Sequence, residues 1–255
     1  MNPVLGDLLV AVGLLGLLLL SLEAGYRFGR GAAITADAGG AGQVGAVQGA
    51  ILGLLGLLLG FSFAAAGARF LERQDLIVAE ANAIGTSFLR ADLLAEPHRS
   101  DLREALRRYT EHRVEVSAGL RGGLAPAALA EMERLHAGIW SAAIAGVTER
   151  PASALSVLPP VNEVIDLHSL RIAAGRKHLP VLVMGLLIAC SALAVAVIGY
   201  GCGLGGSRRT PLTAPLAILI STALWITIDL DHPRAGLIQL SDAPLAALHF
   251  DAPQP

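Results

Sequence analysis

Four stretches of the chain are apolar over lengths that suit membrane helices. They are residues 4–22, 38–68, 179–207 and 210–228. Crossing the hydrocarbon core of a bilayer takes about 20 residues of α-helix. The first run carries one charged residue, Asp7, and the fourth has Pro211 and Pro215 near its beginning, where a helix tolerates proline. The pattern predicts an all-α integral membrane protein with four transmembrane helices.

The segment between the second and third runs is polar but keeps a helical periodicity. Nothing breaks the second helix at Arg69, so we expect it to continue to about residue 94, well outside the membrane. The segment predicts a helical cytosolic domain inserted between the second and third transmembrane helices. The expected division of the chain is 1–68 for the first two spans, 69–178 for the cytosolic domain, 179–229 for the last two spans and 230–255 for a cytosolic tail.

Prolines and apolar stripes divide this inserted segment into helices. Pro97 and Pro126 suit the first turns of a second and a third helix. A linker bracketed by Pro151, Pro159 and Pro160 should precede a fourth helix, which begins at about residue 161. The second helix carries an apolar stripe of Leu102, Ala105, Leu106 and Tyr109, and the third one of Leu129, Met132, Leu135, Ile139 and Ala143. These stripes predict a bundle with its own core.

The second apolar run contains glycines at a regular spacing. Gly49, Gly53, Gly56 and Gly60 fall within about 60° of each other on a helix. In lipid, small residues at such spacings let two helix backbones approach closely. The stripe therefore predicts a tight seam, either within the subunit or between copies of the chain.

The opposite face of this helix carries Leu54, Leu58 and Phe61 and points either to lipid or to a pore. Around a shared axis, rings of Leu58 and Phe61 would form a constriction that excludes water.

Polar residues gather on the two helices expected to meet at the membrane face. Glu80 and Asn82 lie on the extension of the second helix. Asn162, Glu163, Asp166 and Arg171 lie on the helix that leads into the third span. Arg73, Arg90 or Arg171 could pair there with Glu80 or Asp166. The set could form a helix–helix salt-bridge network or line an aqueous vestibule beneath a pore.

An acidic pair, Asp229 and Asp231, follows the fourth span. Two carboxylates at this position could attract cations, or they could be a solvated helix end.

Composition narrows the range of functions. Only 16% of the residues are charged and the formal net charge is −2, which argues against a nucleic-acid partner. Glu133 and His136 form a single Glu-x-x-His, whereas a di-iron bundle needs two such pairs. Nucleotide-binding and hydrolase motifs are missing from the sequence. The sequence therefore indicates no metal site and no cofactor, and it argues against an enzyme.

Basic residues near the span ends suggest an orientation. The side that holds both termini and the inserted domain has six of them, and the other side has four. The six are Arg69, Arg73, Arg171, Arg176, Lys177 and Arg234, and the four are Arg27, Arg30, Arg208 and Arg209. The excess predicts cytoplasmic termini.

Four segments resemble the bacterial bestrophin-like domain family: GAVQGAILGLLGLLLGFSF, VAEANAIGTSFLRADLL, VNEVIDLHSLRIAA and DLDHPRAGLIQLSDAPL. The resemblance implies a multi-pass protein of the bacterial inner membrane with the architecture described above. The chain is more distantly similar to bestrophin channels, which are pentamers with a neck formed by the second helix. Leu54, Leu58 and Phe61 would be the nearest counterparts of that neck.

Two departures from the bestrophin pattern affect what the resemblance implies. Bestrophins carry Arg-Trp-Trp-Glu-x-Arg after the neck, and this chain has the shorter Arg-Phe-Leu-Glu-Arg at residues 69–73. Bestrophins also hold calcium in a run of acidic residues after the fourth helix, where this chain has only Asp229 and Asp231. The resemblance therefore does not imply that this chain binds calcium.

Three functions remain open. The first is a homo-oligomer, possibly pentameric, that conducts an inorganic ion through a hydrophobic gate on the second helix. The second is a non-conducting membrane scaffold or sensor whose cytosolic helical domain binds a partner. The third is a membrane enzyme, for which Glu80, Asp166 and His168 are the only catalytic set that can be assembled. The lipid bilayer is the partner common to all three.

Overall fold

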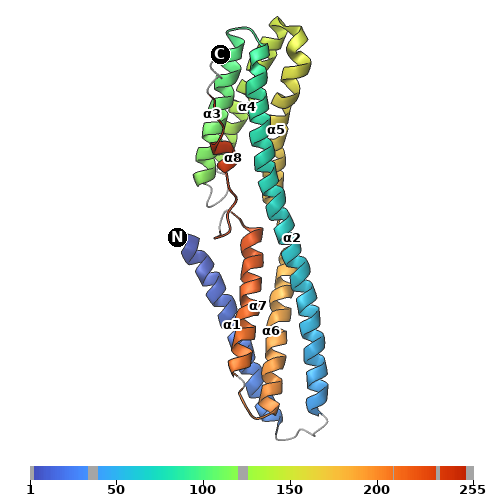
Figure 1. Ribbon diagram of the computed structural model, residues 1–255. Coiled ribbons are helices and arrows are strands. Elements are labelled where there is room, and N and C mark those ends of the chain that lie inside the picture. The colour runs from blue at the N-terminus through green and yellow to red at the C-terminus, as the bar shows by residue number, and fades with distance from the viewer. Residues whose placement is uncertain (1–2, 34–39, 120–125, 209, 234–235, 251–255) are drawn as a thin grey trace. The chain divides into compact units, whose positions relative to one another are not determined.

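The computed structural model describes residues 3–33, 40–119, 126–208, 210–233 and 236–250, and within these ranges it contains no strand (Figure 1). Residues 38–39 of the second apolar run, and Arg209 and Arg234 of the orientation argument, lie outside the described residues. The α-helices are α1 (Pro3–Ala32), α2 (Gly40–Arg90), α3 (His98–Gly119), α4 (Pro126–Glu149), α5 (Ala154–Arg176), α6 (Val181–Leu204), α7 (Thr210–Asp231) and α8 (Ala243–Ala246). Short 3₁₀ turns occupy Ala91–Leu93 and Pro151–Ser153.

The prediction of four helices able to span a membrane is confirmed. By length and composition, four helical stretches qualify: Leu5–Ala32, Gln43–Leu93, Pro151–Leu204 and Thr210–Asp231. The second is 51 residues long, more than twice what a bilayer requires, and the third, of 54 residues, contains both α5 and α6. Their uncharged parts, residues 43–68 and 179–204, supply the apolar spans.

The chain forms two compact units. Unit 1 comprises Met1–Arg69 and His178–Ile238, and unit 2 comprises Phe70–Lys177 and Gln239–Pro255. Helix α2 is unbroken from Gly40 to Arg90, and the units divide between Arg69 and Phe70. Its first part therefore belongs to unit 1 and its second part to unit 2. The expectation that this helix continues past Arg69 is therefore confirmed.

In unit 1, α1 packs against α6 and α7, and α2 joins them through Leu55. Gln48 of α2 also donates a hydrogen bond from Nε2 to the carbonyl oxygen of Val197 in α6, at 2.8 Å. Such a bond satisfies a polar side chain that lipid cannot solvate. The buried side chains of this unit are Leu14, Leu18, Leu55, Leu187, Ala194, Val195, Ala217, Ile220 and Leu224.

The closest helix contact in unit 1 is built from glycines on both α1 and α6. A Cβ atom placed on any of four of them would lie 1.9–2.3 Å from a backbone carbonyl oxygen of the facing helix. The pairs are Gly25 with Ala196, Gly29 with Tyr200, Gly199 with Leu22 and Gly203 with Tyr26. Each helix thus presents two glycines four residues apart, and the two backbones touch because neither side carries a side chain.

The glycine stripe singled out from the sequence does not form this seam. At Gly49, Gly53, Gly56 and Gly60, an added Cβ would meet no atom of the described chain within 4 Å. The sequence left open whether the stripe packs within the subunit or against another copy of the chain. The described part of the subunit supplies no packing partner for it.

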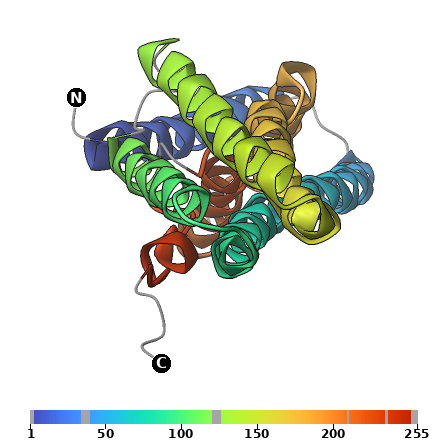
Figure 2. The ribbon, with the colours of Figure 1, turned by 90° about the horizontal axis from the view of Figure 1, so that it is seen from above.

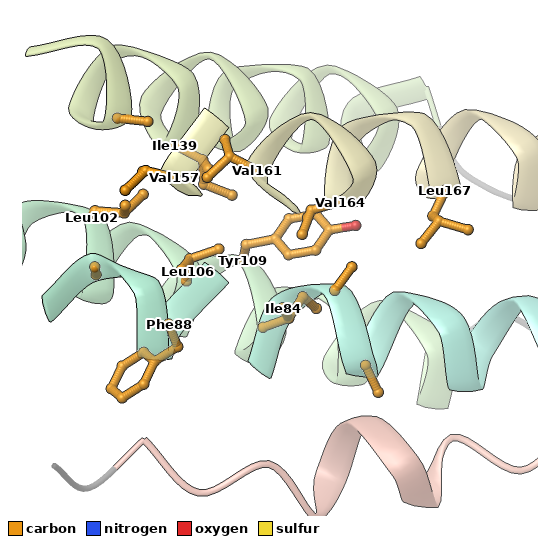
Figure 3. Packing of buried hydrophobic residues seen from close by; sticks show 14 of the residues in the cluster. Ile84, Phe88, Leu102, Leu106, Tyr109, Ile139, Val157, Val161, Val164 and Leu167 are labelled. Carbon is orange, nitrogen blue, oxygen red and sulfur yellow. The ribbon is translucent and has the colours of Figure 1, made fainter. Parts of the chain in front are cut away.

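Unit 2 is a helical bundle formed by the second part of α2 with α3, α4 and α5 (Figures 1 and 2). The predicted apolar stripes of α3 and α4 meet in its core, where Leu102, Leu106, Ile139 and Ala143 are fully buried. Figure 3 shows Tyr109 extending between the helices beside Val164 and Ile84. The prediction of a separate helical core is confirmed by these contacts.

The expected linker before α5 is wrong, because α5 begins at Ala154 and contains both Pro159 and Pro160. A proline in a helix removes the hydrogen bond to the carbonyl four residues earlier. For Pro160 that carbonyl belongs to Ser156, and Arg90 of α2 donates to it from Nη1 at 2.8 Å. A side chain from another helix therefore replaces the missing donor.

The C-terminal segment of unit 2 packs against its helices. Gln74 of α2 forms two hydrogen bonds with the backbone of Ser241, donating to its carbonyl at 3.0 Å and accepting from its N–H at 2.9 Å. Leu245 is buried in the core, and the ring of Phe250 lies edge-on to Phe88 at 5.2 Å. These contacts extend the core of unit 2 beyond α2–α5.

We predict that Gly199→Ala will destabilise unit 1 by about 1–3 kcal/mol, because the new methyl group would overlap the carbonyl of Leu22 and force α1 and α6 apart. Gly185→Ala, on the open side of the same helix, is the matched control. Thermal unfolding of the detergent-solubilised variants checks this expectation. Equal melting temperatures for the two variants would contradict it.

Candidate functional site

The apolar part of α2 carries the residues predicted to form a gate. Leu54 and Phe61 are 53% and 67% exposed in the single chain, and their neighbour Leu57 is 55% exposed. Leu58 differs from them because it packs against the core of unit 1. The uncovered surface of α2 thus combines the exposed side chains of Leu54, Leu57 and Phe61 with the glycines at 49, 53, 56 and 60.

A buried carboxylate organises the polar centre of unit 2. Glu80 of α2 is fully buried. Its Oε1 accepts a hydrogen bond from the hydroxyl of Tyr109 at 2.5 Å, and its Oε2 accepts one from Nη1 of Arg171 at 2.5 Å. Arg113 Nε lies 3.6 Å from Oε1, and Arg113 Nη2 lies 3.8 Å from Oδ1 of Asp242. Two carboxylates therefore balance two guanidinium groups, of which Glu80 and Arg113 are fully buried and Asp242 and Arg171 are partly exposed.

Two histidines border this cluster. The ring of His136 lies 4.9 Å from Tyr109 and 4.7 Å from His168, and both histidines are 9% exposed. Burial lowers the pKa of His136, and it lowers the pKa of His168 to about 4, with His136 and Arg171 adding to the effect on His168. Both imidazoles are therefore neutral at pH 7.

Burial also shifts the pKa values of two groups that contact Glu80. It lowers the pKa of Arg113 to about 10, with the charge of Arg171 contributing, and the guanidinium still stays charged at pH 7. Burial and the charge of Glu80 raise the pKa of Tyr109 well above its usual value, so its phenol remains a hydrogen-bond donor. Arg113 and Tyr109 therefore keep the same protonation states over the physiological range.

The structure brings together only part of the predicted polar set. Glu80 and Arg171 pair, as one of the sequence alternatives expected. The remaining members lie on exposed surface, where Asp166 accepts a hydrogen bond from Asn162 at 2.7 Å. Those exposed members are Asn82, Asn162, Glu163 and Asp166. Of the residues considered for an enzyme, Glu80 and His168 border one buried cluster and Asp166 does not join it.

Arg113 was missed by the sequence reasoning, although a signal for it was present. It lies four residues after Tyr109 on the same apolar stripe of α3. A charged residue on a buried stripe calls for a buried partner of opposite charge. That partner is on α2, and no spacing within α3 indicates it.

The Arg-Phe-Leu-Glu-Arg segment uses its charged residues to hold helix ends. In unit 2, Arg73 donates hydrogen bonds to the carbonyl oxygens of Ala174, at 3.1 Å, and Lys177, at 2.5 Å. Glu72 pairs with the ammonium group of Lys177 at 3.1 Å. In unit 1, Arg69 Nε donates to Oδ1 of Asp231 at 3.2 Å. Arg73 thus caps the C-terminus of α5.

Asp229 and Asp231 lie in the last turn of α7, and both are buried, at 3% and 1% exposure. The interpretation as a solvated helix end is therefore wrong. Asp229 accepts hydrogen bonds from the N–H groups of Leu237, at 3.0 Å, and Ile238, at 2.8 Å. A Cβ on Gly236 would lie 1.5 Å from this carboxylate, so only glycine leaves room for it. Asp231 also accepts from the N–H of Leu179 at 2.9 Å.

Comparison with known proteins yields one match. The model of a family described as the Bestrophin-like domain matches residues 15–245, which covers most of both units. No curated protein and no solved structure shows significant similarity to the chain.

We predict that Glu80→Gln will destabilise unit 2 by about 3–5 kcal/mol, because two buried guanidinium groups would lose their shared carboxylate. Asp166→Asn, on the exposed face of α5, should change stability by less than about 0.5 kcal/mol. Urea unfolding can be followed through Trp140 in a Trp225→Phe background, since these are the two tryptophans of the chain. A Glu80→Gln midpoint equal to that of the control would contradict this prediction.

We also predict that unit 2 loses stability as the pH falls from about 6.5 to about 4. The unfolded chain binds a proton at the ordinary histidine pKa of 6.5, whereas folded His168 does so only near 4, so protons favour unfolding between these values. The loss should be on the order of 2 kcal/mol and should level off below pH 4. His168→Gln should reduce the pH dependence measured through Trp140. A slope unchanged by this substitution would contradict the assignment.

Proposed function

The chain belongs to the bestrophin-like domain family, and on this premise we propose that it is an oligomeric ion channel in which the apolar part of α2 surrounds a shared axis. One observation carries the proposal. From Gly49 to Phe61, α2 leaves its glycines and the side chains of Leu54, Leu57 and Phe61 uncovered by the described part of the single chain.

The glycines support assembly on physical grounds. Apolar burial does not drive helices together in lipid, whereas close backbone approach does. Within the subunit, α1 and α6 already form their contact through Gly25, Gly29, Gly199 and Gly203, and they leave the stripe of α2 uncovered. A second copy would cover that stripe with close helix–helix contact.

The gate would then lie on the adjoining apolar face. Leu54 and Phe61 project away from the subunit core, whereas Leu58 packs against it. In a ring of α2 helices, the side chains of Phe61 and Leu54 would narrow the axis and exclude water. The gate proposal therefore relies on Phe61 more than on Leu58.

The proposed setting is the bacterial inner membrane, with the termini and unit 2 in the cytoplasm. The excess of basic residues on that side of the spans supports this orientation. In this arrangement the exposed polar side chains of α5 and α2, among them Asn82, Glu163 and Asp166, would line the vestibule. The buried pair of Glu80 and Arg171 would hold its wall together.

A non-conducting scaffold or sensor is the second candidate. The observation that favours it is on α5, where Leu155 is 90% exposed and Leu170 is 54% exposed. Exposed leucines on a folded helical unit suit a protein partner. This function needs no symmetry axis.

We predict that the full-length protein, purified in detergent and weighed by native mass spectrometry, is a homo-oligomer, with a pentamer as the expected form. In liposomes, Phe61→Ala should raise ion leak by about tenfold or more, because the constriction loses five phenyl rings in a pentamer. Phe28→Ala, which removes an exposed phenyl ring from α1, should leave the leak unchanged.

The two measurements separate the candidate functions. A monomer would remove the axis on which conduction depends and would favour the scaffold. An oligomer whose flux is unaffected by Phe61→Ala would retain the assembly but contradict the gate.

A further inference from the structure

Two histidines lie beside the buried carboxylate of Asp231 in unit 1. His178 precedes α6, and His232 directly follows the last residue of α7. Their rings are stacked, with centroids 4.5 Å apart and an interplanar angle of 10°. Nδ1 of His178 lies 3.4 Å from Oδ2 of Asp231, and Nδ1 of His232 lies 4.0 Å from the same oxygen. One ligand atom from each of the three residues can be chosen so that all lie within 4.8 Å of one another.

We propose that His178, Asp231 and His232 form a binding site for a divalent transition metal ion, for which Zn²⁺ is the natural probe. Tetrahedral Zn²⁺ bound at about 2.0–2.1 Å places its ligand atoms roughly 3.3 Å apart. The distance from His178 Nδ1 to Asp231 Oδ2, 3.4 Å, is close to this value, and Nδ1 of His232, at 4.0 Å, would have to come about 0.7 Å closer to the same oxygen. Both histidines are partly exposed, at 39% and 51%, so their rings have room to turn.

The carboxylate is held in place before any metal arrives. Arg69 donates to Oδ1 of Asp231 at 3.2 Å, and the N–H of Leu179 donates to Oδ2 at 2.9 Å. Outer hydrogen bonds of this kind orient a ligand and restrict its motion. The backbone carbonyl oxygen of Asp231, at the negative end of α7, accepts a hydrogen bond from Nδ1 of His178 at 2.9 Å, and a metal ion bound at Nδ1 would replace this proton.

The donor set selects the class of metal. Two imidazole nitrogens and one carboxylate oxygen suit Zn²⁺ and its neighbours in the first transition row. Calcium needs six to eight oxygen ligands, and the other carboxylate of the pair, Asp229, is already engaged by two backbone N–H groups. The acidic pair therefore does not form a calcium site by itself.

A bound ion would join two segments that lie far apart in sequence. His178 stands at the entry to α6 and Asp231 at the exit of α7, with Arg69 of α2 at the same carboxylate. The metal would fasten the ends of these spans to one another. This role does not depend on whether the protein conducts ions.

The test uses full-length protein in detergent, purified without a histidine tag and stripped with EDTA. Titration with Zn²⁺ should show one ion per chain, and Co²⁺ should give the visible absorption of a tetrahedral nitrogen–oxygen site. His232→Ala and His178→Ala should each weaken Zn²⁺ binding by more than about tenfold. His249→Ala, which alters an exposed histidine in unit 2, is the matched control and should bind Zn²⁺ normally. Excess Ca²⁺ should not displace the metal.

Two outcomes would overturn the proposal. One is Zn²⁺ uptake that is the same in His232→Ala as in the unmodified protein, which would mean an adventitious ion only. The other is no uptake of Zn²⁺ or Co²⁺ by the stripped protein. His232 is half-exposed, so this variant is expected to fold, and an unchanged thermal unfolding curve without metal verifies that.

Discussion

Direct contact between the backbones of α1 and α6 is the constraint on which unit 1 depends. Hydrocarbon side chains gain little by leaving lipid for other hydrocarbon, so the helices need contact at short range. Gly25, Gly29, Gly199 and Gly203 provide it, because each stands opposite a carbonyl oxygen that any side chain would displace. With α1 seated on α6 in this way, α2 attaches through Leu55 and keeps much of its surface uncovered.

Unit 2 is held together differently, by a core with one ionic centre. Leucines, valines and Tyr109 bury apolar surface between the helices (Figure 3), and that term does not choose between similar packings. Glu80 selects one packing arrangement, because a buried carboxylate needs partners of opposite charge and must therefore lie where Arg113 and Arg171 can reach it. A buried carboxylate thereby fixes how α2, α3 and α5 meet.

Helix α2 belongs to both units, and the proposed gate and the proposed vestibule both involve it. Its first part presents glycine and apolar side chains to whatever surrounds unit 1, and its second part anchors the ionic centre of unit 2. At the join, Arg69 and Arg73 secure Asp231 and the end of α5, respectively, each within its own unit. The match to the Bestrophin-like domain covers residues 15–245 and so includes the whole of this helix.

The sequence by itself determined the four apolar spans, the unbroken course of α2 and the stripes of α3 and α4, because hydropathy and periodicity are local properties. The pairing of Glu80 with Arg171 was also within its reach, as one of several options. Only the tertiary structure decided which glycines touch, that Arg90 lets α5 continue through Pro160, and that Asp231 is buried beside two histidines. Each of these depends on which helices meet, and residues distant along the chain carry no local sign of that.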